Sequence, residues 1–217
     1  ESAYSNSGIE NTTIICKSNK RANQYNQKIR SEILWQEDII SAGDIMMVVK
    51  NNYYWLDEDH EAGFLANGDI IEILKINEIK KIYGFQFAFV LIKMLDYPDQ
   101  DEIETILLLD SINSESPSLN YQKYKKLYEE IALDYKGEKD RNKKIKENKF
   151  FNAIQVKFAY SITCHKSQGG QWNEVFIDQG FFKKEFLNKN YLRWLYTAFT
   201  RATKKVYLIN FNDNFFK

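Results

Sequence analysis

The chain has 217 residues, of which 44% are hydrophobic, and its 30 Lys and Arg balance its 30 Asp and Glu. This length allows one domain or two small ones. The net charge of zero excludes a protein that binds nucleic acid through a generally basic surface, so such binding would need a local patch or a second domain.

Residues 1–50 have the pattern of the start of an α/β unit. Residues 12–16 (TTIIC) form an apolar, β-branched run that is typical of a buried strand. A helix should follow, with Ser18 or Asn19 as its cap. Its apolar side chains recur at helical spacing: Ala22, Tyr25, Ile29 and Ile33. Residues 44–49 (DIMMVV) predict a second buried strand, which we assign to the same unit.

A different pattern begins after residue 50, where short apolar runs alternate with polar turns as far as residue 110. This alternation is typical of antiparallel strands in a small barrel. The apolar runs lie at 70–74, 82–95 and 103–109. In the middle run, Phe85, Phe87 and Phe89 alternate, and we expect them to fill the barrel core. Residues 118–149 are polar and rich in Lys, Glu and Tyr, and we expect them to be helical.

The α/β pattern resumes at about residue 151. Strands are predicted at 154–162, 174–178 and 205–211, and a helix at about 190–203. The predicted fold class is therefore α/β, with a parallel-sheet domain that is interrupted by a small β-barrel. The parallel-sheet domain should comprise residues 1–50 and 151–217. The inserted barrel, with its helical extension, should comprise residues 51–150.

A polar segment at 160–170 (YSITCHKSQGG) follows an apolar strand and can carry chemistry. Thr163 and His165 point to the same side if the strand extends that far. Lys166 supplies a positive charge beside two glycines that allow close backbone approach. This combination suits the phosphate backbone of DNA or the phosphates of a nucleotide. An ordinary polar turn between a strand and a helix explains the same residues equally well.

A second segment, LYTAFTRA at 195–202, is predicted to be helical. One face is expected to be buried, and it consists of Leu192, Leu195, Phe199 and Ala202. Another face carries Arg193, Thr197 and Arg201. An Arg fixed at a helix end can stabilise a transferring γ-phosphate from outside the domain that holds the nucleotide. By position alone, a solvated cation that interacts with the helix dipole is the simpler interpretation of Arg201.

Together, these two segments closely resemble helicase motifs V and VI of superfamily 1, in their RecD-like and Dda-like variety. The family pattern runs Y-A-x-T-x-H-K-x-Q-G and then L-Y-T-A-x-T-R-A. The segment Ile15 to Asn19, with Arg21, Asn26 and Arg30, resembles the motif IV region. The segment Gly43 to Met47, with Lys50 to Asn52 and Asn67-Gly68-Asp69, resembles the family's lead into an SH3-like barrel. The resemblance covers residues 1–75 and 150–217.

The resemblance implies a RecA-like domain with an inserted SH3-like barrel, forming the C-terminal motor half of an ATP-dependent DNA helicase. It implies that Arg201 is the arginine finger. The positions that it places near the nucleotide are Gly169, Gln171, Lys17 and Arg21. The positions expected to contact single-stranded DNA are Thr163, His165, Lys166, Lys50 and Asn51. Two positions depart from the pattern, because the family often has Glu at Gln171 and tends to have Arg at Lys17.

A helicase motor also needs parts that this sequence lacks. It has no G-x-x-x-x-G-K-[ST] and no Walker B carboxylate after a strand, and hydrolysis of ATP needs both. The chain opens with Glu1-Ser2-Ala3-Tyr4, and we expect it to be part of a longer protein. That full-length protein would use ATP with Mg²⁺, while this chain alone should bind no cofactor and be inactive. The implied partners are single-stranded DNA, the missing N-terminal RecA-like domain and other repair proteins.

The main alternative is a non-catalytic nucleic-acid-binding module of a DNA repair or exonuclease complex. A pure binding module has no need of an arginine finger on a separate helix, which favours the motor. A nuclease subunit is a third interpretation, but the acidic residues lack the spacing of nuclease metal ligands. No metal site is predicted, because His60 has no second His or Cys at ligand spacing.

The expected location follows from cysteine use and hydropathy. Cys16 and Cys164 lie far apart, so there is no disulfide framework. No apolar run approaches the roughly 18 residues that span a membrane, so no membrane partner is expected. We therefore expect a cytoplasmic protein, associated with the bacterial nucleoid.

Overall fold

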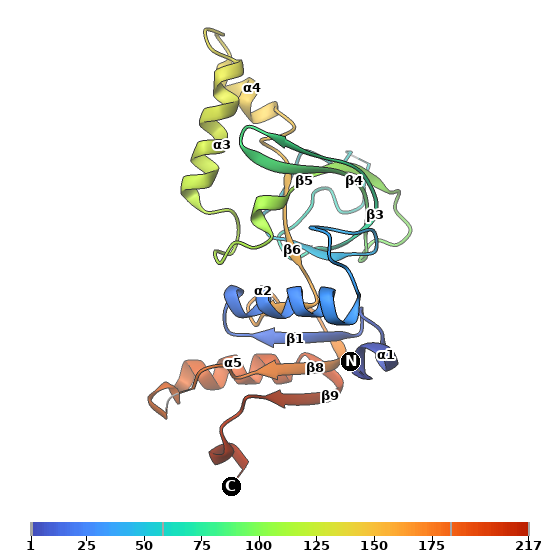
Figure 1. The fold of residues 1–217 in the computed structure, drawn as a ribbon, viewed down its shortest axis with the longest axis vertical. Helices are drawn as coiled ribbons and strands as arrows, with labels where there is room; N and C mark the ends of the chain where they lie inside the picture. Colours follow the sequence, from blue (N-terminus) through green and yellow to red (C-terminus); the bar gives the residue numbers. More distant parts are fainter. Residues whose placement is uncertain (1, 58, 183, 217) are drawn as a thin grey trace. The chain divides into compact units, whose positions relative to one another are not determined.

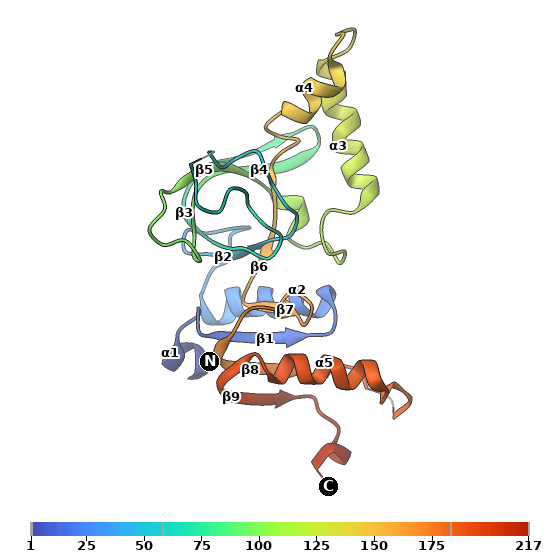
Figure 2. The same ribbon diagram turned by 180° about the vertical axis from the view of Figure 1, so that it is seen from behind.

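The computed structural model describes the chain except for residues 1, 58, 183 and 217. The chain divides into two compact units, which Figures 1 and 2 show from opposite sides. The α/β unit comprises Glu1–Glu37 and Ala159–Lys217, and the barrel unit comprises Asp38–Phe158.

A four-stranded parallel sheet forms the centre of the α/β unit, with strand order β7-β1-β8-β9. Its strands are β1 (Thr12–Cys16), β7 (Ser161–Thr163), β8 (Trp172–Asp178) and β9 (Ala202–Ile209). Every residue of β1 is buried, as expected for a strand with a neighbour on each side and helices on both faces. The predicted strand TTIIC and the predicted parallel sheet are confirmed.

Helices cover both faces of this sheet. The helical elements of this unit are α1 (Ser2–Ser7), α2 (Asn19–Lys28), the π-helical turn η1 (Ile29–Ile33), the 3₁₀ turns η3 (Lys184–Phe186) and η4 (Asp213–Phe216), and α5 (Lys189–Phe199). The cap expected for α2 is confirmed, because the Ser18 side chain accepts a hydrogen bond from the Arg21 backbone N–H. Figures 1 and 2 show α2 on one face and α5 on the other. On the α5 side, Ile15, Val175 and Ile177 pack with Ala198.

The buried face of α5 differs from the predicted one. Tyr191 and Ala198 are buried, and Trp194 and Leu195 pack partly against the core. Leu192 and Phe199, which were expected to be buried, are exposed, with 56% and 40% of their surfaces accessible. Helical spacing allows either face, because both carry aromatic and aliphatic side chains. The helix also ends at Phe199, so Arg201 lies just beyond it and not within it.

The barrel unit contains a closed barrel in the order β2-β3-β4-β5-β6. The strands are β2 (Ile45–Val48), β3 (Ile70–Ile82), β4 (Phe85–Met94), β5 (Ile103–Leu108) and β6 (Ile154–Phe158). All neighbours are antiparallel except β5 and β6. Tyr83 and Gly84 join β3 to β4 with φ angles of 53° and 76°, which is the backbone of a tight type I′ hairpin turn.

Two strands that were assigned to the parallel-sheet domain belong to the barrel instead. β2 pairs with β3 and β6, so the insertion begins before residue 50 and ends after residue 151. A single strand was expected at 154–162, but the chain leaves the barrel after Phe158 and starts β7 at Ser161. The physical reason is that a continuous apolar strand has the same sequence pattern in a parallel sheet and in a barrel wall.

Residues 118–149 are largely helical, as predicted, and they cover one side of the barrel. They form α3 (Tyr121–Asp134) and α4 (Arg141–Glu147), after the 3₁₀ turn η2 (Leu109–Ser111). Phe85 and Phe87 pack with Leu127, Ile131 and Ile145 of these helices. The three Phe residues of β4 were expected in the barrel core. Their side of the strand faces the helices, while the opposite side carries Ala88, Val90, Ile92 and Met94.

Among the described residues, no helix is both long enough and apolar enough to cross a membrane.

Candidate functional site

Arg201 is held in place by three hydrogen bonds. Its Nε donates to the carbonyl oxygen of Thr197 at 3.1 Å, and one terminal nitrogen donates to the carbonyl oxygen of Gly170 at 3.2 Å. The other terminal nitrogen donates to the Thr200 hydroxyl at 3.1 Å. A guanidinium has five N–H groups, so one on each terminal nitrogen donates to no described residue. The result is an oriented cation with two remaining donors.

The polar segment that begins at residue 160 and the segment at 195–202 contact each other around Arg201. The Trp172 backbone N–H donates to the Arg201 carbonyl at 2.9 Å, and Trp172 lies opposite Ala202 in the sheet. Gly169 has a φ of +88° and Gln171 is exposed, so the turn that carries them is open to solvent beside Arg201. Gly169, Gln171 and Arg201 thus lie together at the amino ends of β8 and β9.

Thr163, His165 and Lys166 lie at the other edge of the sheet, where β7 ends. The Thr163 carbonyl accepts from the backbone N–H groups of Lys166 and Ser167, at 2.8 Å and 3.1 Å, which closes a tight turn. His165 is exposed on this turn. Burial lowers the pKa of Lys166, which is half-buried. The turn therefore offers one exposed imidazole and one partly desolvated ammonium.

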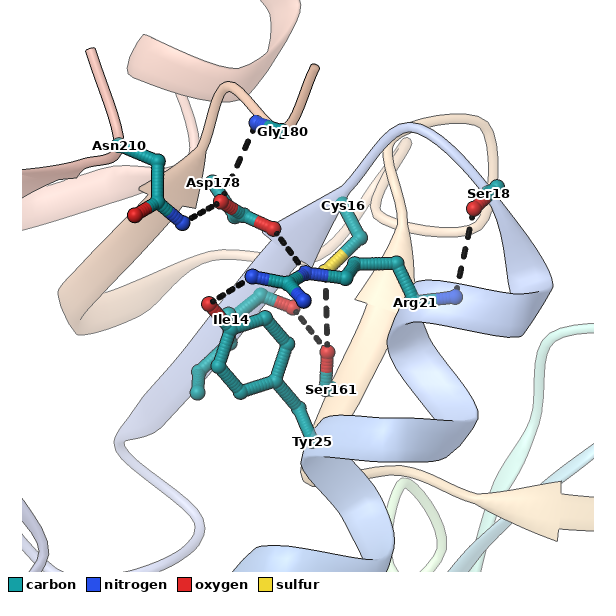
Figure 3. A network of polar contacts seen from close by, with 9 residues as sticks. All are labelled: Ile14, Cys16, Ser18, Arg21, Tyr25, Ser161, Asp178, Gly180 and Asn210. Carbon is teal, nitrogen blue, oxygen red and sulfur yellow. Dashed lines mark hydrogen bonds and ion pairs between the residues drawn. The ribbon is translucent and has the colours of Figure 1, made fainter.

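Arg21 forms an ion pair with Asp178 at the carboxyl ends of β1 and β8, as Figure 3 shows. Its Nε lies 2.7 Å from Oδ2 of Asp178, and its guanidinium stacks on the Tyr25 ring at 4.9 Å. The buried Asp178 also accepts from the Asn210 amide at 2.7 Å and from the Gly180 backbone N–H at 3.2 Å. The hydrogen bond and charge of Asp178 raise the pKa of Arg21. Arg21 is therefore already paired.

Lys17 projects over aromatic rings beside the same carboxylate. Its Nζ lies 4.5 Å from the ring centroid of Tyr191, 4.9 Å from that of Trp194 and 5.8 Å from that of Phe182. Burial lowers the pKa of Lys17, while the charge of Asp178 opposes this shift. Cation–π contacts of this kind hold an ammonium in place without neutralising it.

The structure does not bring Lys17 and Arg21 together with Arg201. Arg201 precedes β9 at the level of Trp172, whereas Arg21 binds Asp178 at the far end of β8. A strand of this length separates its two ends by roughly 20 Å. Asp178 was not predicted as the partner of Arg21. The sequence indicates this residue only as the acidic end of the strand EVFID. Its pairing with Arg21 could not be predicted, because the two residues are 157 positions apart.

Lys50 and Asn51 lie in the barrel unit. The Lys50 ammonium is 4.1 Å from the centroid of the Tyr124 ring, and burial lowers its pKa. The Asn51 side chain accepts from the Asn67 backbone N–H at 2.8 Å and donates to the Tyr53 hydroxyl at 3.3 Å. Among the described residues, no group of three or more His, Cys, Asp or Glu could hold a metal ion.

Comparison with known proteins identifies one part of the chain. Residues 158–209 match the UvrD-like helicase C-terminal domain. The matched range is less than half of the chain, and it contains both the turn at Thr163–Gln171 and Arg201. This segment is therefore similar to the C-terminal domain of UvrD-like helicases. No curated protein sequence matches the chain.

Solved structures of Pif1 helicases are also similar to the chain. The enzyme from Candida albicans has 13% identity and a TM-score of 0.47, over 94% of this chain and 46% of that one. Bacteroides Pif1 in complex with ADP-AlF3 and ssDNA has 12% identity and a TM-score of 0.45, over 94% and 43%. Bacteroides Pif1 bound to ssDNA has 13% identity and a TM-score of 0.40, over 93% and 41%. The chain spans less than half the length of these proteins.

Proposed function

We propose that this chain is the C-terminal motor half of an ATP-dependent DNA helicase of superfamily 1, in the RecD-like and Dda-like branch. In this proposal the α/β unit is the second RecA-like domain and the barrel is SH3-like. The observation that carries the proposal is the fixed guanidinium of Arg201 beside Gly169 and Gln171. All three residues lie in the segment that matches the UvrD-like helicase C-terminal domain.

The proposed role of Arg201 follows from its remaining donors. Charge-assisted hydrogen bonds from a planar guanidinium to phosphate oxygens are strong and can be bidentate. Arg201 keeps one free N–H on each terminal nitrogen among the described residues, which fits a phosphate group. ATP with Mg²⁺, when bound by the missing N-terminal RecA-like domain, supplies the γ-phosphate. Arg201 would stabilise the charge that develops there, from outside the domain that holds the nucleotide.

Single-stranded DNA is the proposed second ligand. In the α/β unit, Thr163, His165 and Lys166 would contact the backbone at the end of β7. In the barrel unit, Lys50 and Asn51 would provide further contacts. Backbone contacts and stacking carry no base code, so binding should be indifferent to sequence. We assign Lys17 and Arg21 to the interface with the missing domain. They lie at the carboxyl ends of β1 and β8, which are remote from Arg201.

We propose that the complete protein acts in the cytoplasm, at the bacterial nucleoid, alongside other repair proteins. The alternative of a non-catalytic nucleic-acid-binding module makes a different prediction for Arg201, because such a module needs no arginine finger.

Substitution of Arg201 in the complete protein tests the motor. Arg201→Ala should reduce DNA-stimulated ATP hydrolysis by about 10³-fold or more, as loss of an arginine finger does. The matched control is Arg193→Ala, which removes an exposed cation from α5 and should leave the rate within about twofold. Thermal unfolding should show that both variants fold. An unchanged turnover in Arg201→Ala would remove this residue from the mechanism and favour the binding module.

A further inference from the structure

The barrel unit contains a pocket whose lining includes Lys50 and Asn51, the two barrel residues proposed above to contact single-stranded DNA. It is a cavity of about 460 Å³, lined by residues 50–54 after β2, by Tyr124 of α3, by Lys146 of α4 and by the approach to β6. We call it the Lys50 pocket. Its volume lies in the range of cavities that hold small organic ligands.

The charged groups that line the Lys50 pocket are both positive. They are Lys50 and Lys146, and no carboxylate lines the cavity. Within the described part of the chain, neither ammonium forms an ion pair. Lys50 is an exposed residue, and the partial burial of its ammonium lowers its pKa. A cavity with two such cations favours an anion.

Aromatic rings form part of the pocket wall. Lys50 lies 4.1 Å from the Tyr124 centroid, and the Tyr124 ring in turn lies 5.2 Å from that of Phe151. Tyr54 also lines the cavity, with 42% of its surface accessible. Rings of this kind can stack on a planar ligand, and each stacked base contributes ~1–3 kcal/mol in proteins that bind single strands.

Gln155 gives the pocket a hydrogen-bond donor of fixed orientation. Only 6% of this residue is accessible, and it lines the cavity. Its side-chain oxygen accepts from the Leu119 backbone N–H at 2.9 Å, which fixes the orientation of the amide. The amide nitrogen donates to no described residue. A donor that is fixed in orientation on the wall of the cavity can bind an acceptor of a ligand.

A second cavity in the same unit shows that these features are not general to the barrel. It has a similar size, about 410 Å³, and five carboxylates line it: Asp57, Asp59, Asp101, Glu102 and Glu104. These charges repel a polyanion. The Lys50 pocket is therefore the cavity of the two that can accept a phosphate.

We propose that the Lys50 pocket binds one unstacked nucleotide of single-stranded DNA. The phosphate would lie against Lys50 and Lys146, the base against Tyr124 or Tyr54, and a base acceptor would take the Gln155 amide donor. An acidic peptide would use the two cations but not the aromatic wall. The choice of a DNA strand rests on the proposed function, while the chemistry of the pocket stands on its own residues.

Fluorescence anisotropy of the full chain with labelled single-stranded oligo(dT) tests the pocket. Lys50→Gln keeps the side-chain stem, and Tyr124→Leu keeps an apolar contact with Phe151. Lys50→Gln should weaken binding about fivefold, and Tyr124→Leu about tenfold. The matched control is Lys143→Ala, which removes an exposed cation of α4 that lies outside the cavity, and it should change affinity less than about twofold. Thermal unfolding shows whether each variant is folded.

Photocrosslinking gives a second measurement that does not depend on variants. An oligonucleotide with one 5-iododeoxyuridine should crosslink to Tyr124 or Tyr54, as read by mass spectrometry of the peptides. Crosslinks confined to other residues, or unchanged affinity in both Lys50→Gln and Tyr124→Leu, would overturn the proposal. Competition by thymidine monophosphate or by an acidic peptide that equals competition by the oligonucleotide would also overturn it.

These outcomes separate the pocket from the motor. If Arg201→Ala abolishes DNA-stimulated ATP hydrolysis but the pocket variants bind oligo(dT) normally, only the pocket fails. If the pocket variants lose binding while Arg201→Ala hydrolyses ATP normally, the pocket stands in a protein that is not the proposed motor.

Discussion

Gly170 and Trp172 are packed so closely that a Cβ at Gly170 would lie 2.4 Å from the Trp172 ring. The same two residues bind Arg201, through the Gly170 carbonyl and the Trp172 backbone N–H. The position of the Arg201 guanidinium therefore depends on a glycine at 170, and this dependence gives a first prediction.

Gly170→Ala should destabilise the chain by about 1–3 kcal/mol, because the Trp172 ring must move to admit the methyl group. Urea unfolding measures this change. In the double variant Gly170→Ala with Trp172→Leu, the smaller side chain should relieve the clash, so the total loss should be less than the sum of the two single losses. Additive losses would show that the two positions are not coupled by packing.

The observed buried face of α5 predicts which substitutions are tolerated. Leu192→Ser should change the free energy of unfolding by no more than about 0.5 kcal/mol, because Leu192 is exposed. Ala198→Leu should cost about 1–3 kcal/mol, because Ala198 is fully buried against Ile15 and Val175. If the buried face were the one expected from helical spacing, Leu192→Ser would cost more stability than Ala198→Leu. Chemical denaturation of the two variants decides between them.

Cys16 should make the stability of the fold depend on alkaline pH. Burial raises the pKa of its thiol from 9.0 to about 12, so the folded state holds this proton more tightly than the unfolded state. The stabilising contribution is fully present below pH 9.0 and is lost as pH rises towards about 12. A stability difference between the parent and Cys16→Ala should therefore shrink above pH 9.0, by at most about 1.4 kcal/mol per pH unit.

Comparing the parent with Cys16→Ala cancels the titration of the buried tyrosines, which both proteins share. Below pH 9.0 the difference in unfolding free energy should be constant. A difference that stays constant across the alkaline range would contradict the assignment of this effect to Cys16.

The turn after β7 should contribute to DNA affinity in a salt-dependent way. In the complete protein, Lys166→Ala should weaken binding to single strands of any sequence and reduce the salt slope of log K by about 1. His165→Ala should weaken binding to single strands. Titrations at several salt concentrations measure both. His60→Ala, in the acidic loop of the barrel unit, is the control and should leave affinity and slope unchanged.

Local chemistry explains what the sequence predicted correctly. The β-branched run at 12–16 and the Ser18 cap depend on neighbouring residues only, and both are as expected. The partners of β2 depend on strands that are far away in the sequence, so its place in the barrel could not be read from its own pattern. The buried face of α5 was missed for the same reason. Tyr191 is fixed by the Gln179 amide, which donates to its hydroxyl at 2.6 Å, and by Lys17 from another strand end.

The candidate site was likewise predictable only in part. Gly169, Gln171 and Arg201 could be expected to meet, because each segment borders a predicted strand of one parallel sheet. The separation of Lys17 and Arg21 from Arg201 follows from strand direction and register, which composition does not reveal. The Lys50 pocket combines residues from three segments of the barrel unit. Its basic and aromatic character was visible only at Lys50 and the tyrosines that follow it.

The order of the strands has a consequence for synthesis on the ribosome. Both sheet neighbours of β1, which are β7 and β8, are translated only after the whole barrel unit. The hydrogen bond from Ser161 to Ile14 spans 147 positions, whereas every strand of the barrel lies within Asp38–Phe158. The barrel can therefore form before either strand that pairs with the apolar strand β1 has been synthesised. Nascent chains that stall before residue 161 should expose β1 to chaperones, and closure of this long-range pairing should limit the rate of refolding.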